Sequence, residues 1–112
     1  MSYNEAHDGL IREKNKKLVD EFEKHLQQNN LSHKTIKRQT QDLNFFTEYL
    51  VYYEPFKELS EIDSSDVSGF LGGFFPRKAL WANQAYVKQY ITIFKKLFKW
   101  MIAIDLMQDE EY

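Results

Sequence analysis

The sequence predicts an all-α protein, a compact four-helix bundle that forms one domain over residues 1–112. Only four Gly and two Pro occur in 112 residues, which is few for the many tight turns of an all-β chain. Apolar residues recur at helical spacing in long stretches that lack both, and polar residues suited to helix capping precede several of these stretches. Residues 1–9 and 108–112 lie outside them and are expected to be flexible ends.

The first predicted helix spans about residues 10 to 29. Leu18, Phe22 and Leu26 follow one another at a spacing of four, which places them on one side of a helix. The rest of its surface is charged, and Asn29-Asn30 provides an exit. This pattern is typical of a helix that packs through one side.

The second predicted helix begins after Ser32, whose hydroxyl can accept a hydrogen bond from an amide in the first turn. It extends to about Tyr53, before Pro55. Its apolar stripe consists of Ile36, Leu43, Phe46 and Leu50. The roughly opposite stripe carries Lys34, Lys37, Arg38 and Gln41. One side is therefore expected to pack, and the other to be basic.

A short third helix is predicted after Asp63, with Asp66 in its first turn and Val67, Phe70 and Leu71 facing inward. Gly72-Gly73 and Pro76 are expected to end it. Residues 74–81 are then predicted to form a loop that carries Arg77 and Lys78.

The fourth predicted helix runs from about Asn83 to Ile104 without Gly or Pro. Its broad apolar face consists of Tyr86, Tyr90, Ile93, Phe94, Leu97, Met101 and Ile104. The other side carries Gln84, Lys88, Thr92, Lys95 and Lys99. A second amphipathic helix with a basic face is thus expected.

Charge is segregated along the chain although the net charge is only −2. Nine of the 15 basic residues fall in the windows 31–41 and 77–99, and neither window contains an acid. The absence of cysteine excludes disulfides and thiolate chemistry, and the histidines lack metal-ligand spacing. No cofactor, metal or small-molecule ligand is expected. Without a signal-peptide core or a membrane-length apolar run, the expected location is the cytoplasm, away from membranes.

Three segments together resemble the core-binding domain of phage integrases and other tyrosine recombinases, also called the SAM-like integrase N-terminal domain. The resemblance rests on order and spacing across about residues 18 to 107. The segments are Leu31 to Ile36 with Asp42-Leu43, Phe46 and Tyr49-Leu50; Leu59, Ile62, Asp66-Val67 and Phe70-Leu71; and Ile91 to Met101.

The resemblance implies that this domain forms half of a clamp around duplex DNA, with its second and fourth helices against the DNA. A separate C-terminal domain does the chemistry in this family. The implied role is in site-specific recombination and integration, with double-stranded DNA, a recombinase catalytic domain or other recombinase protomers as partners. The chain is then either a piece of a longer recombinase or a stand-alone small protein.

Two sets of residues are the candidate DNA contacts, because cations track phosphates and amides can meet base edges. The first set is Lys34, Thr35, Lys37, Arg38 and Gln41. The second is Arg77, Lys78, Asn83, Gln84, Lys88 and Lys95, with Lys99 beside them. The alternative for both is an ordinary solvated helix face. Phe45 and Trp81 are expected to pack rather than to stack on DNA.

No catalytic residue is assigned, so the chain is not expected to be an enzyme. Phosphoryl transfer to a tyrosine needs fixed cations around the phosphate, and the family's catalytic set includes a His-x-x-Arg element. The residues three before Arg12, Arg38 and Arg77 are Gly9, Thr35 and Phe74. The rival function is a protein-interaction module that docks a recombinase through the acidic first helix or the tail and never touches DNA.

Overall fold

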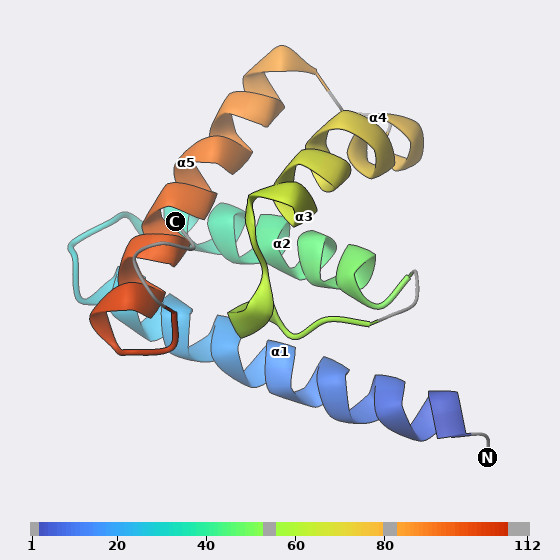
Figure 1. Ribbon diagram of the computed structural model, residues 1–112. Helices are drawn as coiled ribbons and strands as arrows, with labels where there is room; N and C mark the ends of the chain where they lie inside the picture. Colours follow the sequence, from blue (N-terminus) through green and yellow to red (C-terminus); the bar gives the residue numbers. More distant parts are fainter. Residues whose placement is uncertain (1–2, 53–55, 80–82, 108–112) are drawn as a thin grey trace. The chain divides into compact units, whose positions relative to one another are not determined.

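The computed structural model describes residues 3–52, 56–79 and 83–107, with side chains from residue 9 onward (Figure 1). All regular structure in these residues is helical, which confirms the predicted all-α class. The expected end segment 108–112 and Trp81 lie outside the described residues. The chain divides into two units, Met1–Ser60 and Glu61–Tyr112, and each is described by itself.

The first unit contains α1 (Tyr3–Gln27) and α2 (His33–Leu50), which lie side by side and run in opposite directions (Figure 1). Helix α1 begins at Tyr3 rather than near Leu10, where the apolar stripe starts. Extending an existing helix by a few residues avoids the cost of nucleation, so the extension needs no apolar stripe of its own. Apolar periodicity therefore underestimated the length of the helix at its N-terminal end.

The turn between α1 and α2 ends at the predicted cap. Asn30 adopts a left-handed conformation with φ of 61°, which asparagine tolerates better than most residues. The Ser32 hydroxyl then accepts a hydrogen bond of 3.2 Å from the backbone N–H of Thr35. The expected start of the second helix is confirmed.

Helix α2 ends at Leu50, earlier than the predicted end near Tyr53. The Leu50 carbonyl accepts a 3.0 Å hydrogen bond from the backbone N–H of Lys57, a residue that follows the helix. The returning chain thus takes the place of a further helical turn. All four residues of the predicted apolar stripe are buried: Ile36, Leu43, Phe46 and Leu50.

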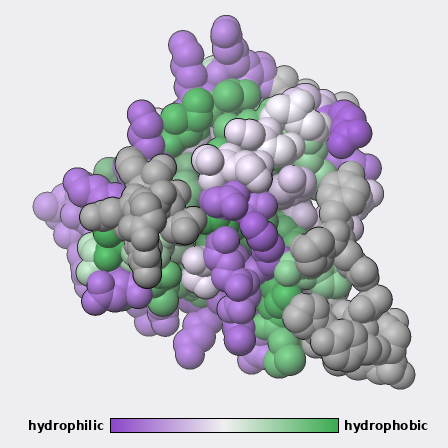
Figure 2. Space-filling view, viewed as in Figure 1, coloured by the Kyte–Doolittle hydropathy of each residue, from purple (hydrophilic) through white to green (hydrophobic). Residues whose placement is uncertain are grey.

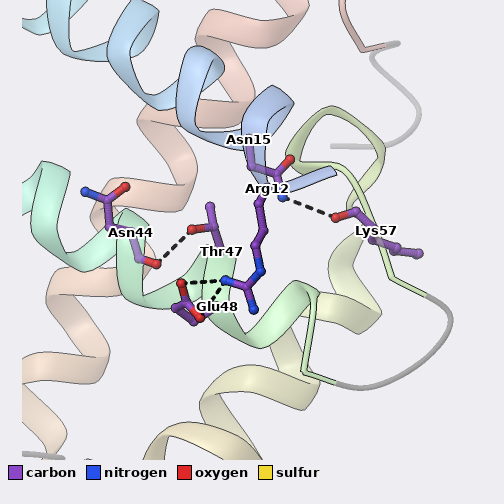
Figure 3. A network of polar contacts seen from close by, with 6 residues as sticks. All are labelled: Arg12, Asn15, Asn44, Thr47, Glu48 and Lys57. Atoms are coloured by element: carbon purple, nitrogen blue, oxygen red, sulfur yellow. Dashed lines mark hydrogen bonds and ion pairs between the residues drawn. The ribbon is translucent and has the colours of Figure 1, made fainter. Parts of the chain in front are cut away.

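Asn15 of α1 holds the segment that follows α2. Its side chain is only 2% exposed. The Oδ1 atom accepts a 2.6 Å hydrogen bond from the backbone N–H of Leu59. The Nδ2 atom donates to the Lys57 carbonyl at 3.3 Å (Figure 3). This segment leads into a 3-10 turn, η1 (Leu59–Glu61).

The second unit begins with α3 (Ser64–Gly69), capped as predicted by Asp63. The Asp63 Oδ1 atom accepts from the amide of Asp66, whose carboxylate in turn accepts from the Asp63 amide. This reciprocal pair is a capping box. Both expected roles of these aspartates are confirmed.

The predicted end of the third helix at Gly72-Gly73 is wrong. The chain continues through a π-helical turn, η2 (Phe70–Phe74), into α4 (Phe75–Lys78). None of the described glycines has a positive φ, and Pro76 lies in the first turn of α4, where its missing N–H costs little. Arg77 and Lys78 therefore lie on a helix and not on a loop.

Helix α5 (Gln84–Ala103) covers almost the whole predicted fourth helix. Tyr90 is fully buried and meets the rings of Phe70 and Phe75 edge-on, each at 5.1 Å between centroids. One predicted core residue is misplaced: Ile104 is 44% exposed. It is the C-cap, with φ −103° and ψ 15°, so the helical periodicity no longer applies there.

Candidate nucleic-acid interface

The first candidate set lies on one side of α2, and we call it the α2 surface: Lys34, Thr35, Lys37, Arg38 and Gln41. All except the half-buried Thr35 are exposed. On α1, Arg12, Lys14 and Lys16 form ion pairs with Glu48, Glu58 and Asp20, and none of these pairs includes a residue of the α2 surface. Lys34 and Lys37 therefore present their charges to the solvent, whereas the exposed Arg38 also interacts electrostatically with the buried Asp42.

Thr35 is partly engaged by the helix cap. Its backbone N–H donates to the Ser32 hydroxyl, and its own Oγ1 accepts a 2.9 Å hydrogen bond from that hydroxyl. The amide is thus occupied within the protein, whereas the Thr35 hydroxyl proton stays available to an acceptor. This geometry makes Thr35 a hydroxyl donor rather than part of an amide site for phosphate.

Asp42 is an acid beneath the α2 surface that the sequence reasoning passed over. It is 8% exposed, and burial raises the pKa of its carboxyl from 3.8 to about 6, although the nearby Arg38 guanidinium lowers it. Gln39, 3% exposed, is a second buried polar residue on this helix. Gln39 falls on the helical stripe of Ile36, Leu43 and Phe46, and Asp42 lies at its edge, four residues before Phe46. This spacing is the signal that could have identified them.

Glu48 lies seven residues beyond Gln41, on the same side of α2, and Arg12 of α1 neutralises it. Arg12 Nη1 lies 2.9 Å from one Glu48 carboxylate oxygen and 3.0 Å from the other (Figure 3). The pair borders a groove of about 330 Å³ lined by Arg12, Asn15, Lys16, Asn44, Thr47 and Glu48. The exposed acid at the end of the α2 surface is therefore compensated by a cation from the neighbouring helix.

The second candidate set divides between two places in its own unit. Gln84, Lys88 and Lys95 are exposed and share one side of α5, and we call them the α5 surface. Asn83 precedes the helix as its N-cap, with Oδ1 accepting a 3.0 Å hydrogen bond from the Tyr86 amide. The side-chain NH₂ group of Asn83 takes no part in that cap.

Arg77 and Lys78 occupy the last turn of α4. The Arg77 Nε atom donates a 3.0 Å hydrogen bond to the carbonyl of Gly73, so its side chain folds back toward the preceding turn η2. Both residues are exposed. They lie on a different helix from the α5 surface, because α4 ends at Lys78 and α5 begins at Gln84.

An apolar groove of about 280 Å³ runs between α3 and α5. Its lining consists of Ser64, Val67, Ser68, Ile91, Phe94, Lys95 and Phe98. Ile91 is 41% exposed, and it lies between two residues of the α5 surface, three residues after Lys88 and four before Lys95. In Figure 2 hydrophobic atoms are exposed between hydrophilic side chains over α5. Sequence reasoning gave Ile91 no role, although its spacing from the two lysines was the available signal.

The described residues provide neither a metal site nor a membrane-spanning helix. They contain no group of three or more histidine, aspartate or glutamate side chains arranged to hold a metal ion. Among them there is also no helix that combines the length and the apolar character needed to cross a bilayer.

A family model described as the phage integrase N-terminal SAM-like domain matches residues 19–103. The chain belongs to this family. Every residue of the α2 and α5 surfaces lies within the matched region. The match assigns the chain to the N-terminal SAM-like part of integrases and not to their catalytic domain. Comparison with curated proteins and with solved structures found no match to the chain.

Proposed function

We propose that this integrase N-terminal domain grips duplex DNA through its α2 and α5 surfaces during site-specific recombination and contributes no catalytic group itself. The observation that carries the proposal is the α2 surface: three exposed cations on one side of one helix, opposite its buried apolar stripe, in a domain of the integrase family. Net acidity is no obstacle, because the acids lie in other parts of the sequence.

Phosphate contacts supply the affinity. Each lysine or arginine that neutralises a phosphate releases condensed counterions, and this release favours binding at low salt. Lys34, Lys37 and Arg38 are suited to this role because their exposed side chains point away from a buried apolar stripe. Gln41 and Gln84 carry both a donor and an acceptor, so they are the side chains suited to base edges.

The proposed absence of catalysis rests on catalytic residues that the sequence lacks. Cleavage by a tyrosine nucleophile requires cations and a general acid or base around the scissile phosphate. No arginine in the chain follows a histidine at the His-x-x-Arg spacing. In a complete recombinase, the proposed partner of this domain is therefore the catalytic domain that cuts the DNA it grips.

A binding titration against a mixed-sequence duplex at two salt concentrations tests the proposal. We expect the wild-type chain to lose affinity steeply as salt rises. The variant Lys34→Glu/Lys37→Glu/Arg38→Glu should bind more weakly at both concentrations, and its log–log salt slope should be shallower by about 0.9 for each phosphate contact removed.

The matched control is Lys14→Glu/Lys17→Glu/Lys24→Glu, which makes the same change in net charge on α1. It should retain most of the affinity, because α1 lies outside the two proposed DNA-binding surfaces. Loss of the partly exposed ion pair between Lys14 and Glu58 should also cost little stability. Equal losses in the two variants would contradict the site assignment. Absence of binding to any duplex, together with a stable complex with a recombinase, would instead support the protein-interaction module.

A further inference from the structure

We propose that Ile91 gives the α5 surface a preference for thymine, because its exposed side chain contacts the C5-methyl group that thymine presents in the major groove. The inference rests on the proposed function. It adds a base identity to a surface whose other members provide cations and an amide.

Ile91 is placed between two cations of the same helix side. Lys88 precedes it by three residues and Lys95 follows it by four, so the three side chains are neighbours on the surface of α5. Its side chain is 41% exposed, whereas that of Ile93, two positions along, is 1% exposed. Ile91 thus belongs to the outward side of α5 and not to its core side.

The spacing of the two lysines suits a duplex. Seven residues of helix separate Lys88 from Lys95, which is about 10 Å along the axis. The major groove is about 12 Å wide. Two flexible ammonium groups at that separation can reach phosphates on both sides of the groove, while the short, stiff Ile91 side chain between them meets the base edges.

The surroundings of Ile91 favour an apolar contact. It lines the groove between α3 and α5 with Val67, Phe94 and Phe98. A methyl group placed against Ile91 leaves water without covering a charged group, since the lysine side chains extend past it to the phosphates. Among the base pairs, only thymine offers a methyl group in the major groove, whereas cytosine offers an N–H donor that an isoleucine leaves unsatisfied.

The test compares two duplexes of the same alternating sequence, one with adenine and thymine and the other with adenine and uracil. They differ only in the C5-methyl groups. By fluorescence anisotropy at low salt, the wild-type chain should bind the thymine duplex about fourfold more tightly, the gain expected from burying one methyl-sized group. Ile91→Ala should bind both duplexes equally, and Ile91→Val should keep part of the preference.

Ile104→Ala is the matched control, because Ile104 is a similarly exposed isoleucine, 44%, at the far end of α5. It should keep the full preference. If Ile91→Ala keeps it as well, or if the wild type shows none while still binding both duplexes in a salt-dependent way, the thymine inference is overturned and the proposed function stands. Failure of the wild type to bind either duplex at low salt would overturn the proposed function itself.

Discussion

At the scale of single residues, Asn15 illustrates how one buried polar side chain fixes a chain segment. It satisfies the amide of Leu59 and the carbonyl of Lys57, two backbone groups that follow α2. Both bonds join positions more than 40 residues apart in sequence. Their geometry depends on the side chain's reach, so no apolar substitute can replace it.

Replacing Asn15 with alanine should lower the free energy of unfolding by about 1–3 kcal/mol, because the buried Leu59 amide loses its acceptor. Urea denaturation measures this change. Asn44→Ala is the control, since Asn44 is exposed on α2 and surface substitutions of this kind change stability by less than about 0.5 kcal/mol. Equal effects of the two substitutions would contradict the role given to Asn15.

Asp42 makes stability depend on pH. Its pKa is about 6 in the folded chain and 3.8 as a reference, so the folded state binds a proton more tightly than the unfolded one. Its contribution to the free energy of unfolding is therefore fully present below about pH 4 and is lost as the pH rises through about 6. The ionised carboxyl therefore opposes folding at neutral pH.

Asp42→Asn should raise the free energy of unfolding by about 1–3 kcal/mol at pH 7.5, and the gain should shrink to nothing near pH 4. Thermal unfolding of both proteins across this pH range gives the comparison. Asp20→Asn, at an exposed position of α1, should show no such pH-dependent gain. A gain for Asp42→Asn that is the same at pH 4 and pH 7.5 would mean that the charge of Asp42 is not its cause.

At the scale of elements, the stretch from α3 through η2 to α4 shows aromatic packing overriding helix-breaking residues. Phe70, Phe74 and Phe75 are all buried, and Phe70 lies 6.0 Å from Phe74 and 5.6 Å from Phe75 between ring centroids. The backbone N–H of Phe75 reaches the carbonyl of Phe70, five residues back. The wider π-helical turn thus keeps these rings together across Gly72 and Gly73.

Gly72→Ala tests whether this turn needs glycine. A Cβ at position 72 would meet no atom within 4 Å, and the backbone there has no positive φ. The substitution should raise the free energy of unfolding by about 0.5–1 kcal/mol, because alanine loses less backbone entropy in a helix. Chemical denaturation checks the sign.

Gly73→Ala is the companion variant, because a Cβ there would lie 3.8 Å from Arg77 Nη2, an ordinary contact. It should be neutral or mildly stabilising. A loss of stability in Gly72→Ala would show that the π-helical turn requires the flexibility of glycine rather than tolerating it.

At the scale of the whole molecule, the segregation of charge is the property that connects sequence with function. A chain of net charge −2 carries most of its cations in two acid-free windows, and these windows become the α2 surface and the region of α4 and α5. Charges so separated attract a polyanion locally while the protein remains acidic overall.

If both surfaces contact the same duplex, charge reversal on each should weaken binding independently. Lys88→Glu/Lys95→Glu should lower the affinity for DNA. Its log–log salt slope should be shallower by about 0.9 for each of the two phosphate contacts removed. Combined with the triple substitution on the α2 surface, the losses in binding free energy should add, as they do for separated sites. DNA titrations of the two single-surface variants and the combined variant measure these losses. If the Lys88→Glu/Lys95→Glu variant binds DNA as tightly as the wild type, the α5 surface is not part of the DNA interface.

The sequence allowed the helices and much of the candidate interface to be predicted, for a definite reason. Helical periodicity, caps such as Ser32 and Asp63, and acid-free windows are local properties of the sequence. They can be recognised without knowing how distant segments pack. The family resemblance added the partner class. It also came from local patterns, since order and spacing of helical motifs record it.

Tertiary structure decided what depends on atoms distant in sequence. Four features depend on contacts that no local pattern encodes. They are the end of α2 at Leu50, the hydrogen bonds from Asn15 to the segment after α2, the neutralisation of Glu48 by Arg12, and the continuation of the helix past Gly72-Gly73. The pKa of Asp42 and the exposure of Ile91 and Ile104 are of the same kind. The sequence determined which residues form helices and where charge gathers, whereas packing determined which of those residues meet water, because burial depends on neighbours that only the folded chain brings together.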